Sequence, residues 1–386
     1  MNKNAIVVGA GFFGTTVARI LAENGWKVEV VESRDFVGGN CHSHFEDGIE
    51  VHDYGPHTFH TNNEDVWRFV NRFSEFTQFE QHAIALHGGV PYFLPFGMSL
   101  ICKFFGLGGS EATPDGVRRL MEGKRTENDF PNNVEEQAMS SIGEELYNAF
   151  VRDFTKKKWN RDPKELPASI LERIPVRYDF SINYFNDVHQ GMPAEGFTKM
   201  FENMLDHENI SVSLGDFYDR KRLDDDIEGG KTVVYTGAID ELMDYEIGEL
   251  DWRSLKFETK KFEMKDFQGI SIVNHVDSDV PYTRTVEFKH FHPELKNIME
   301  LDKTIVQYEY PDDWKQGNDM FYPIDDIYNG ETWQKYAAQL NYLYGGKLFL
   351  GGRLGLYKYL DMDETIELAI STANSIINGE TQNVLD

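Results

Sequence analysis

Three glycines near the start of the chain have the spacing of a phosphate-binding turn. Gly9, Gly11 and Gly14 follow the apolar run 5–8 in the pattern G-x-G-x-x-G. Glycine permits a tight turn and lets backbone approach a pyrophosphate, while the helix that follows presents its positive end to that anion. Glu32 ends the next apolar segment, where a carboxylate can accept hydrogen bonds from ribose hydroxyls. These residue types indicate a dinucleotide site.

A strand, a helix and a second strand must position those residues. Residues 5–8 predict the first strand, a helical apolar face follows up to Gly25, and 27–31 predict the second strand. The segment from Glu32 to Gly39 then has the pattern E-x-R-x-x-x-G-G. It resembles FAD enzymes of the glutathione-reductase-like and amine-oxidase-like class, so a flavin is favoured over a nicotinamide cofactor.

The composition indicates a globular, acidic protein. The 386 residues are 40% hydrophobic and carry a formal net charge of −27, which suits two or three domains and disfavours nucleic acid or an anionic membrane as a partner. No apolar run reaches the about 20 residues of a membrane helix, and Cys41 and Cys102 form neither a disulfide framework nor a metal-spaced cluster. The first residues lead into a strand rather than a signal peptide, so we expect a cytoplasmic protein.

Five histidines crowd the segment 42–60, and a metal site is one interpretation of them. Their spacing matches no H-E-x-x-H pattern, and no cluster of cysteine and aspartate partners accompanies them. We therefore expect no metal here. The segment is either a polar loop or a loop that faces the cofactor, with His57 able to donate to a flavin edge.

The middle of the chain predicts an inserted helical domain. Residues 98–172 have helical periodicity, and 134–151 predict one continuous helix. Near the end of the domain, lysines 156–158 precede Trp159. Such a run is typical of a solvated face, but beside a tryptophan in an acidic protein it is equally consistent with the rim of an anion site.

Residues 161–186 predict a long loop. It carries Arg173 and Arg177, followed by the aromatic residues Tyr184 and Phe185. Guanidinium groups beside aromatic rings suit a diphosphate joined to a planar base. The alternative is surface charge over core aromatics.

The predicted fold class is α/β. Residues 210–214 and 232–237 predict strands that return to the dinucleotide sheet, whereas 252–310 are rich in strands of a second, antiparallel sheet. A buried strand over 347–353 ends in G-G-R before a last helix at 364–377. The predicted domains are a split Rossmann-like FAD-binding domain (1–77, 196–240 and 343–386), a helical domain with a mobile substrate loop (98–172), and an antiparallel β-sheet substrate domain (78–97, 173–195 and 241–342).

Six motifs together resemble the bacterial UDP-galactopyranose mutase family over nearly the full chain. They are GAGFFG at 9–14, YGPHTFHT at 54–61, LPASILERIPVRYDFSINYF at 166–185, QGMP at 190–193, VPYTR at 280–284 and GGRLGLYKYLDMD at 351–363. The resemblance implies an isomerase that needs reduced FAD and makes no net redox change. In the family's mechanism, flavin N5 attacks the anomeric carbon and expels UDP, and the resulting sugar–flavin adduct recloses as furanose.

The resemblance also implies residue roles. Arg173 and Arg284 would clamp the diphosphate, and His57 would lie beside the isoalloxazine. The other implied substrate contacts are Gln81, Phe154, Thr155, Trp159, Tyr184, Asn274, Tyr310 and Tyr359. The implied cofactor contacts are Gly9, Gly11, Phe13, Gly14, Glu32, Ser33, Arg34, Gly39, Asn40, His57, Thr58, Phe217, Gly237, Gly352, Arg353, Leu360, Asp361 and Met362.

Two positions depart from the family pattern. Phe154 stands where a tyrosine is frequent, and Gln81 where an asparagine is common. Both concern the choice of substrate, including the N-acetylgalactosamine analogue, rather than the reaction. The expected partners are a UDP-sugar, an external reductant for the flavin and a second copy of the chain in a homodimer. The alternatives are an amine-oxidase-like FAD oxidoreductase and a non-catalytic nucleotide-binding protein.

Overall fold

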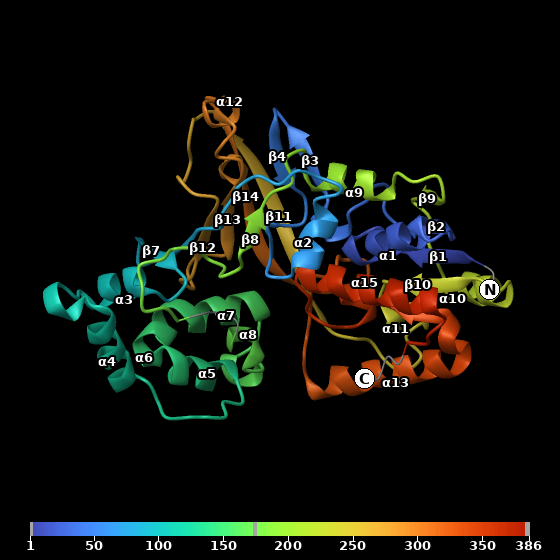
Figure 1. Ribbon diagram of the computed structural model, residues 1–386. Coiled ribbons are helices and arrows are strands. Elements are labelled where there is room, and N and C mark those ends of the chain that lie inside the picture. The colour runs from blue at the N-terminus through green and yellow to red at the C-terminus, as the bar shows by residue number, and fades with distance from the viewer. Residues whose placement is uncertain (1–2, 173–175, 383–386) are drawn as a thin grey trace.

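A five-stranded parallel sheet forms one end of the molecule in this computed structural model, which describes residues 3–172 and 176–382 (Figure 1). The strand order is β16-β10-β1-β2-β9, and all neighbouring strands are parallel. The strands are β1 (Asn4–Val8), β2 (Lys27–Glu32), β9 (Ile210–Leu214), β10 (Thr232–Tyr235) and β16 (Leu348–Leu350). Three separate stretches of chain therefore build this Rossmann-like sheet.

Helices cover both faces of the parallel sheet, because β1 is apolar on both sides. Ala5 and Val7 pack toward one group of helices, whereas Ile6 packs toward another. A nearly continuous apolar strand is typical of a parallel sheet with two covered faces. Helix α13 belongs to the second group, although the predicted boundaries assign 327–342 to the antiparallel domain. The first group is α1 (Phe12–Glu23) and α15 (Met362–Asn378); the second is α10 (Arg220–Glu228), α11 (Ile239–Leu242) and α13 (Ile327–Tyr344).

A seven-stranded sheet stands beside the Rossmann-like part, in the order β15-β11-β14-β13-β12-β6-β7. All neighbouring pairs are antiparallel except β6 and β12, which run parallel, so the predicted antiparallel sheet is in fact mixed. Its strands are β6 (Ala83–His87), β7 (Val90–Leu94), β11 (Trp252–Phe262), β12 (Ile272–His275), β13 (Arg284–Glu287), β14 (Thr304–Asp313) and β15 (Tyr322–Pro323).

The helical part lies below the far end of this sheet in Figure 1. The predicted continuous helix over 134–151 is wrong, because the chain breaks at Gly143, which has φ +79°. A β-carbon there would lie 2.7 Å from the carbonyl oxygen of Lys124, so the break lets two helices approach closely. A π-helical turn, Tyr147–Val151, then leads into α7. The helices are α3 (Met98–Phe105), α4 (Pro114–Lys124), α5 (Val134–Ser141), α6 (Gly143–Leu146), α7 (Arg152–Trp159) and α8 (Ser169–Glu172).

An aromatic core joins the parallel sheet to the mixed sheet. Phe12 from α1 contacts the rings of Phe59, Phe197 and Phe201, and the same buried cluster includes Phe288 beyond β13. The two parts are therefore packed together through side chains. The remaining elements are β3 (Ser43–Glu46), β4 (Ile49–His52), β5 (Phe59–Thr61), α2 (Glu64–Val70), β8 (His189–Gly191), α9 (Phe197–Leu205), α12 (Lys296–Met299) and α14 (Gly352–Gly355).

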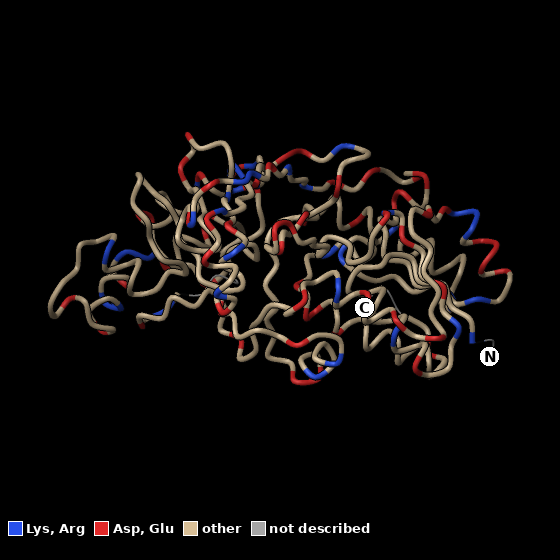
Figure 2. The backbone as a smooth tube through the Cα atoms, turned by 90° about the horizontal axis from the view of Figure 1, so that it is seen from above, with Lys and Arg blue, Asp and Glu red and all other residues tan. Residues whose placement is uncertain are grey.

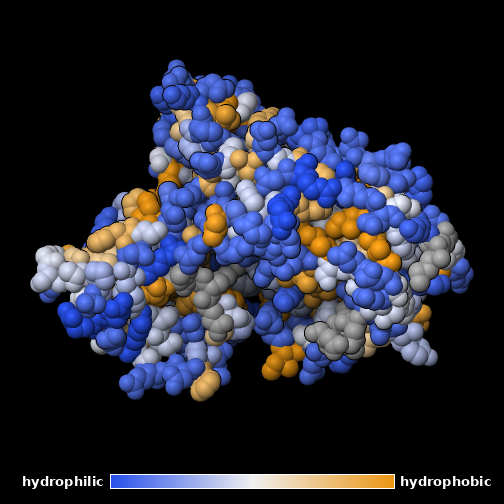
Figure 3. All heavy atoms as spheres, viewed as in Figure 1, coloured by the Kyte–Doolittle hydropathy of each residue, from blue (hydrophilic) through white to orange (hydrophobic). Residues whose placement is uncertain are grey.

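The surface is polar and predominantly acidic. Acidic and basic residues are interspersed along the whole backbone in Figure 2, without a long basic stripe. The face shown in Figure 3 is mainly hydrophilic, with separate hydrophobic patches. Within the described part of the chain, no helix has the length and apolarity to cross a membrane.

Candidate active site

The glycine-rich turn joins β1 to α1 by close backbone packing. A β-carbon on Gly14 would lie 2.0 Å from the carbonyl oxygen of Gly9, so only glycine lets the helix start there. Gly11 differs, since a β-carbon on it would meet nothing nearer than Gly39 at 3.9 Å. A β-carbon on Gly39 would lie 3.3 Å from the Gly11 Cα, so these two backbones lie against each other beside the first backbone N–H groups of α1, which could bind an anion.

Glu32 closes this turn from the end of β2. One oxygen of its buried carboxylate accepts from the backbone N–H of Ala10 at 2.8 Å, and the other from that of Arg34 at 2.9 Å. Ser33 donates to the second oxygen at 3.3 Å. These bonds fix the carboxylate at the carboxyl end of the sheet, where a dinucleotide ribose binds in this architecture.

Other predicted cofactor residues have varied environments. Arg34 pairs with Asp319 at 2.6 Å and lies 4.4 Å over the ring of Tyr54, so it also ties a distant loop to the turn. The amide of Asn40 donates to the carbonyl oxygen of Met320 in that same loop. Phe217 is 64% exposed beyond β9, where a planar group could stack on it.

Arg284 begins β13, directly opposite Asn274 on β12. Its Nε donates to Oδ1 of Asn274 at 3.1 Å, and its guanidinium lies 3.6 Å from the carboxylate of Glu309. Burial opposes the positive charge, but Glu309 together with nearby tyrosines outweighs the effect of burial, so the pKa of Arg284 lies above its ordinary value. Glu309 is 1% exposed and is itself held by the hydroxyl of Thr283 at 2.8 Å. The structure therefore fixes a permanent cation here.

Three tyrosines surround this cation. Tyr322, Tyr184 and Tyr359 lie close enough that their charge interactions also raise the pKa of Arg284. The rings of Tyr322 and Tyr359 stack at 6.0 Å, and the guanidinium of Arg353 lies 4.5 Å over Tyr359. The arrangement brings phenol hydroxyls and guanidinium groups together, which suits an anionic diphosphate.

Tyr322 was not predicted, and Tyr310 does not join the cluster. Adjacent strand residues point to opposite faces, and because Glu309 faces Arg284, its neighbour Tyr310 faces away. The hydroxyl of Tyr310 instead donates to Glu258 at 3.2 Å on the other face. Burial raises the pKa of Tyr322, whose hydroxyl therefore stays protonated as a donor. No sequence spacing marks Tyr322 or Glu309, since both enter the site through the fold.

Helix α7 brings one wall of the site to this cluster. Trp159 lies 5.9 Å from the ring of Tyr322, and the ammonium of Lys158 lies 4.5 Å over that same ring. Thr155 is buried, while Phe154 is partly buried against the core of the helical domain. The predicted helical residues therefore do approach the sheet residues at one end of α7.

Arg177, which the sequence suggested as a diphosphate contact, instead bonds to the backbone of its own loop. It is 8% exposed, and its guanidinium donates to the carbonyl oxygens of Asn183 and Tyr184. Burial lowers its pKa. Arg177 therefore closes the loop that presents Tyr184. Arg173 lies outside the described residues.

His57 lies next to His52. Burial first, and then the charges of His52 and Arg353, lower the pKa of His57 to about 3, so its imidazole is neutral near pH 7. Among the described residues, its Nδ1 is buried and has no hydrogen-bond partner. Its backbone N–H donates to Nδ1 of His52 at 3.0 Å. The residue is thus held through its backbone, with an unpaired ring nitrogen available.

Gln81 is buried and bonded to its neighbours in the protein. It is 3% exposed, accepts from the hydroxyl of Thr58 at 2.9 Å and donates to the hydroxyl of Ser271 at 3.2 Å. Thr58, a predicted cofactor contact, is thereby tied to the mixed sheet. The amide of Gln81 is bonded inside the protein, and its substrate role stays a prediction.

The last cofactor segment leads into α15. Arg353 donates to the carbonyl oxygens of Phe321 and Leu360, at 3.1 and 2.8 Å, and so links this segment to the strand of Tyr322. Asp361 caps α15 in a capping box with Glu364. Gly237 and Gly352 flank the same ends of β10 and β16, with φ +70° at Gly352. The segment therefore connects the parallel sheet to the tyrosines around Arg284.

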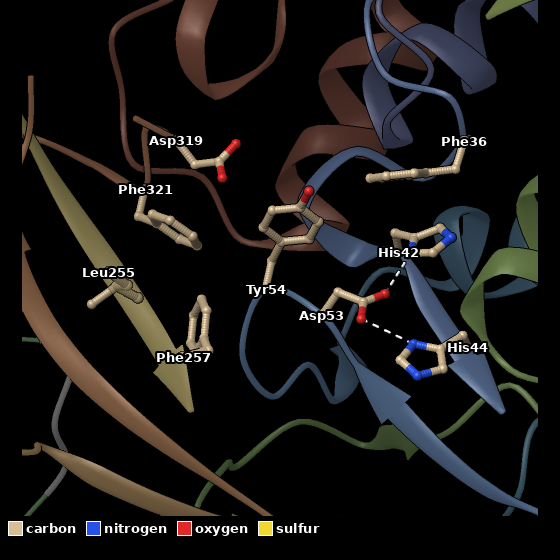
Figure 4. Close-up of a pocket in the computed structure, with 9 residues that line it drawn as sticks. All are labelled: Phe36, His42, His44, Asp53, Tyr54, Leu255, Phe257, Asp319 and Phe321. Carbon is tan, nitrogen blue, oxygen red and sulfur yellow. Dashed lines mark hydrogen bonds and ion pairs between the residues drawn. The ribbon is translucent and has the colours of Figure 1, made fainter. Parts of the chain in front are cut away.

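A cavity of about 620 Å³ lies between the segment 36–54 and β11. Figure 4 shows Asp53 between the imidazoles of His42 and His44, with aromatic rings across the cavity. The two Nδ1 atoms lie 2.6 and 2.9 Å from the Asp53 carboxylate. His60 likewise pairs with Asp187 at 2.9 Å. His42 and His44 thus share a carboxylate of their own segment, whereas His60 has a partner far along the chain.

Comparison with known proteins supports these observations. The sequence model described as UDP-galactopyranose mutase matches residues 149–359, and that of an NAD(P)-binding Rossmann-like domain matches 7–73. A probable UDP-galactopyranose mutase of Klebsiella pneumoniae is 39% identical, over 98% of this chain and 95% of its own length. The chain belongs to the UDP-galactopyranose mutase family.

Other relatives show the breadth of the family. A dTDP-fucopyranose mutase of Escherichia coli is 38% identical over 99% of this chain and 100% of its own length. A structure of reduced UDP-galactopyranose mutase superposes with a TM-score of 0.72 at 16% identity, covering 98% of this chain and 96% of that one. Putrescine oxidase shares the fold at a TM-score of 0.53 and 11% identity, covering 97% and 99%. As a member of the mutase family, this chain is an isomerase.

Proposed function

We propose that this isomerase interconverts UDP-galactopyranose and UDP-galactofuranose, with reduced FAD as its cofactor. The observation that carries the proposal is the buried Arg284, held by Glu309 and Asn274 and surrounded by tyrosine hydroxyls. A fixed cation with several phenol donors matches the charge of a nucleotide diphosphate. An amine oxidase would need an apolar cage at this place instead.

The residues on the parallel sheet fit FAD. The first backbone N–H groups of α1, where Gly11 lies close to Gly39, could bind a pyrophosphate, and Glu32 is fixed for a ribose. The neutral His57 ring, whose Nδ1 has no hydrogen-bond partner among the described residues, could pair with a polar edge of the flavin. When bound and reduced, the flavin would supply an electron-rich N5 as the nucleophile toward the sugar's anomeric carbon.

The chain's own residues would stabilise the departing diphosphate. Arg284 remains protonated at any working pH, so it offsets negative charge that develops on UDP as the anomeric bond breaks. Tyr322 and Tyr359 would donate to phosphate oxygens, and Trp159 would cover the sugar side. Arg173 stays the predicted second guanidinium of this clamp. The same diphosphate, held in place, would be positioned to return to the sugar after ring closure.

A second substrate class has specific support. The Escherichia coli relative is a dTDP-fucopyranose mutase and is as similar to this chain as the Klebsiella pneumoniae relative. Helix α7, which would lie on the side of the nucleotide base, carries Phe154. Its phenyl ring has no hydroxyl and can stack on thymine or uracil alike. A dTDP-linked deoxyhexose is therefore the alternative substrate, beside the N-acetylgalactosamine analogue.

The test compares three substrates on one preparation. Dithionite-reduced and oxidised enzyme are each incubated with UDP-galactopyranose, UDP-N-acetylgalactosamine and dTDP-fucopyranose, and the isomers are separated by chromatography. We expect a furanose isomer from UDP-galactopyranose with the reduced enzyme and none with the oxidised enzyme. Faster conversion of dTDP-fucopyranose would reassign the substrate. Amine-dependent peroxide without any furanose product would favour an oxidoreductase, and turnover by oxidised enzyme would contradict the role of reduced flavin.

The remaining proposals concern partners. We propose a homodimer and an external reductant for the flavin, both from the family resemblance. Light scattering of the purified protein measures the first. For the second, flavin absorbance is followed anaerobically while candidate reductants are added, and bleaching identifies an effective one.

A further inference from the structure

The turn between β12 and β13, residues 276–283, links two members of the substrate cluster. Asn274 and Arg284 are paired across the two strands, and the Arg284 side chain donates to Asn274. Helix α7 lies on the other side of the site and carries Trp159. A nucleotide diphosphate that contacts both sides needs a fixed distance between the helix and this hairpin.

Lys157 spans the space between α7 and the turn. Its ammonium donates to the carbonyl oxygens of His275 at 2.7 Å, Asp277 at 3.0 Å and Val280 at 2.8 Å. A lysine ammonium has three N–H donors and no acceptor, so all three are used on one turn. The contact is made to backbone atoms and therefore holds the course of the chain rather than one side chain.

Three carboxylates near Lys157 attract its ammonium without forming its hydrogen bonds. Asp153 on α7 and Asp277 and Asp279 on the turn attract the ammonium, but burial outweighs them and lowers the pKa of Lys157 to about 8. The Asp277 carboxylate is engaged with His87 at 2.6 Å. Burial, and next the ammonium, lower the pKa of the facing His275 to about 4, so that imidazole is neutral. Lys157 is mostly charged at neutral pH and binds the turn through its backbone.

Its neighbours in sequence serve other purposes. Lys156 is exposed and pairs with Asp162 on the surface at 3.0 Å, while Lys158 lies over the Tyr322 ring. The run 156–158 is thus neither a uniform solvated face nor a uniform anion rim. Lys156 provides a matched control, since it differs from Lys157 by one position on the same helix.

We propose that Lys157 is a positioning residue, which sets the distance between the base-side helix α7 and the Arg284 hairpin so that one nucleotide reaches both. This inference rests on the proposed function, because it assumes a nucleotide diphosphate as part of the substrate. Lys157 itself touches neither reacting atoms nor cofactor. Its loss would leave each half-site intact but misaligned.

The experiment compares Lys157→Met with Lys156→Met in the full-length holoenzyme. Dissociation constants are measured for UDP, for uridine and for pyrophosphate, with the wild type as reference. In Lys157→Met we expect UDP to bind about tenfold more weakly, while uridine and pyrophosphate change less than about twofold, because only the linked ligand depends on the alignment. For the sugar nucleotide, KM should rise more than kcat falls. Lys156→Met should match the wild type, and Lys157→Arg should recover part of the lost UDP affinity.

Each other outcome has a meaning. Unchanged UDP affinity in a folded Lys157→Met protein would overturn the inference, as would an equal loss for uridine, which indicates local damage to α7. If Lys157→Met does not fold, Lys157→Arg provides the test. Wild-type affinity of Lys157→Arg for all three ligands would contradict the claim that binding depends on the exact distance between α7 and the hairpin. Wild-type protein that does not bind UDP would refute the proposed function and this inference together, whereas wild-type binding with no effect of substitution refutes the inference alone.

Discussion

The cofactor turn and the substrate cluster are built in opposite ways. The cofactor turn uses backbone groups and glycines from a single stretch, residues 9–39, and its fit depends on close packing such as that of Gly14 on Gly9. The substrate cluster uses charged and aromatic side chains from α7, the loop around Tyr184, β13, β15 and the segment before α15. One half is local in sequence, and the other exists only after folding.

This difference separates two kinds of vulnerability. In the cofactor turn a single methyl group is enough to collide with backbone, whereas the substrate cluster can lose a side chain while its backbone stays in place. Changes in the first half should therefore affect folding and cofactor content together. Changes in the second half should affect turnover while the protein keeps its cofactor.

The largest effect on turnover is expected from Arg284→Ala. The substitution removes the fixed cation that offsets charge on UDP, so kcat/KM should fall by an amount equivalent to about 3 kcal/mol. It also leaves the buried Glu309 without its cationic partner, so the folded state should be less stable. Steady-state kinetics on the reduced enzyme, together with thermal unfolding, separate the two consequences.

Arg284→Lys is the matched control for that change. It keeps a positive charge near Glu309 but loses the Nε bond to Asn274 and the planar fork, so intermediate activity is expected. Both variants should retain a wild-type flavin absorbance spectrum. Near-normal turnover by Arg284→Ala would remove this residue from the diphosphate clamp.

The cofactor half is tested by Gly14→Ala. A β-carbon there would lie 2.0 Å from the Gly9 carbonyl, so α1 must shift, and we expect about 2–3 kcal/mol lower stability together with loss of bound flavin. Gly123→Ala is a suitable control, because a β-carbon there meets nothing within 4 Å and its φ is not positive. Urea unfolding and the ratio of flavin to protein absorbance give the two readouts. A stable Gly14→Ala protein with a full complement of bound flavin would show that the turn tolerates a different packing.

The same difference explains how far the sequence could predict the molecule. The strand before Gly9 and the strand that ends at Glu32 follow local rules, and the structure has them where they were expected. The break at Gly143 was missed because it depends on contact with Lys124, far along the chain. A helical period alone carries no information about such a contact.

The substrate residues show the limit more clearly. Gln81 occupies a position aligned with a nucleotide contact, yet its amide is consumed by Thr58 and Ser271. Tyr310 and Tyr322 are both tyrosines near strand ends, and only the registers of β14 on β13 and of β15 on β11 reveal which face each one meets. Strand register is a property of the folded sheet, and a shift of one residue exchanges the two faces.

The smallest of these effects compares those two tyrosines. Tyr322→Phe removes a hydroxyl beside the Arg284 cation and should lower kcat/KM about tenfold, equivalent to about 1.5 kcal/mol, the range of a hydrogen bond to a charged group. Tyr310→Phe removes a hydroxyl that bonds Glu258 on the other face and should leave kcat/KM within about twofold of the wild type. Both substitutions keep the ring, so stacking of Tyr322 on Tyr359 persists and the comparison isolates the hydroxyl. A larger loss for Tyr310→Phe than for Tyr322→Phe would mean that the substrate approaches the opposite face of the mixed sheet, and the clamp would then have to be rebuilt around Tyr308 and Tyr310 instead of Arg284.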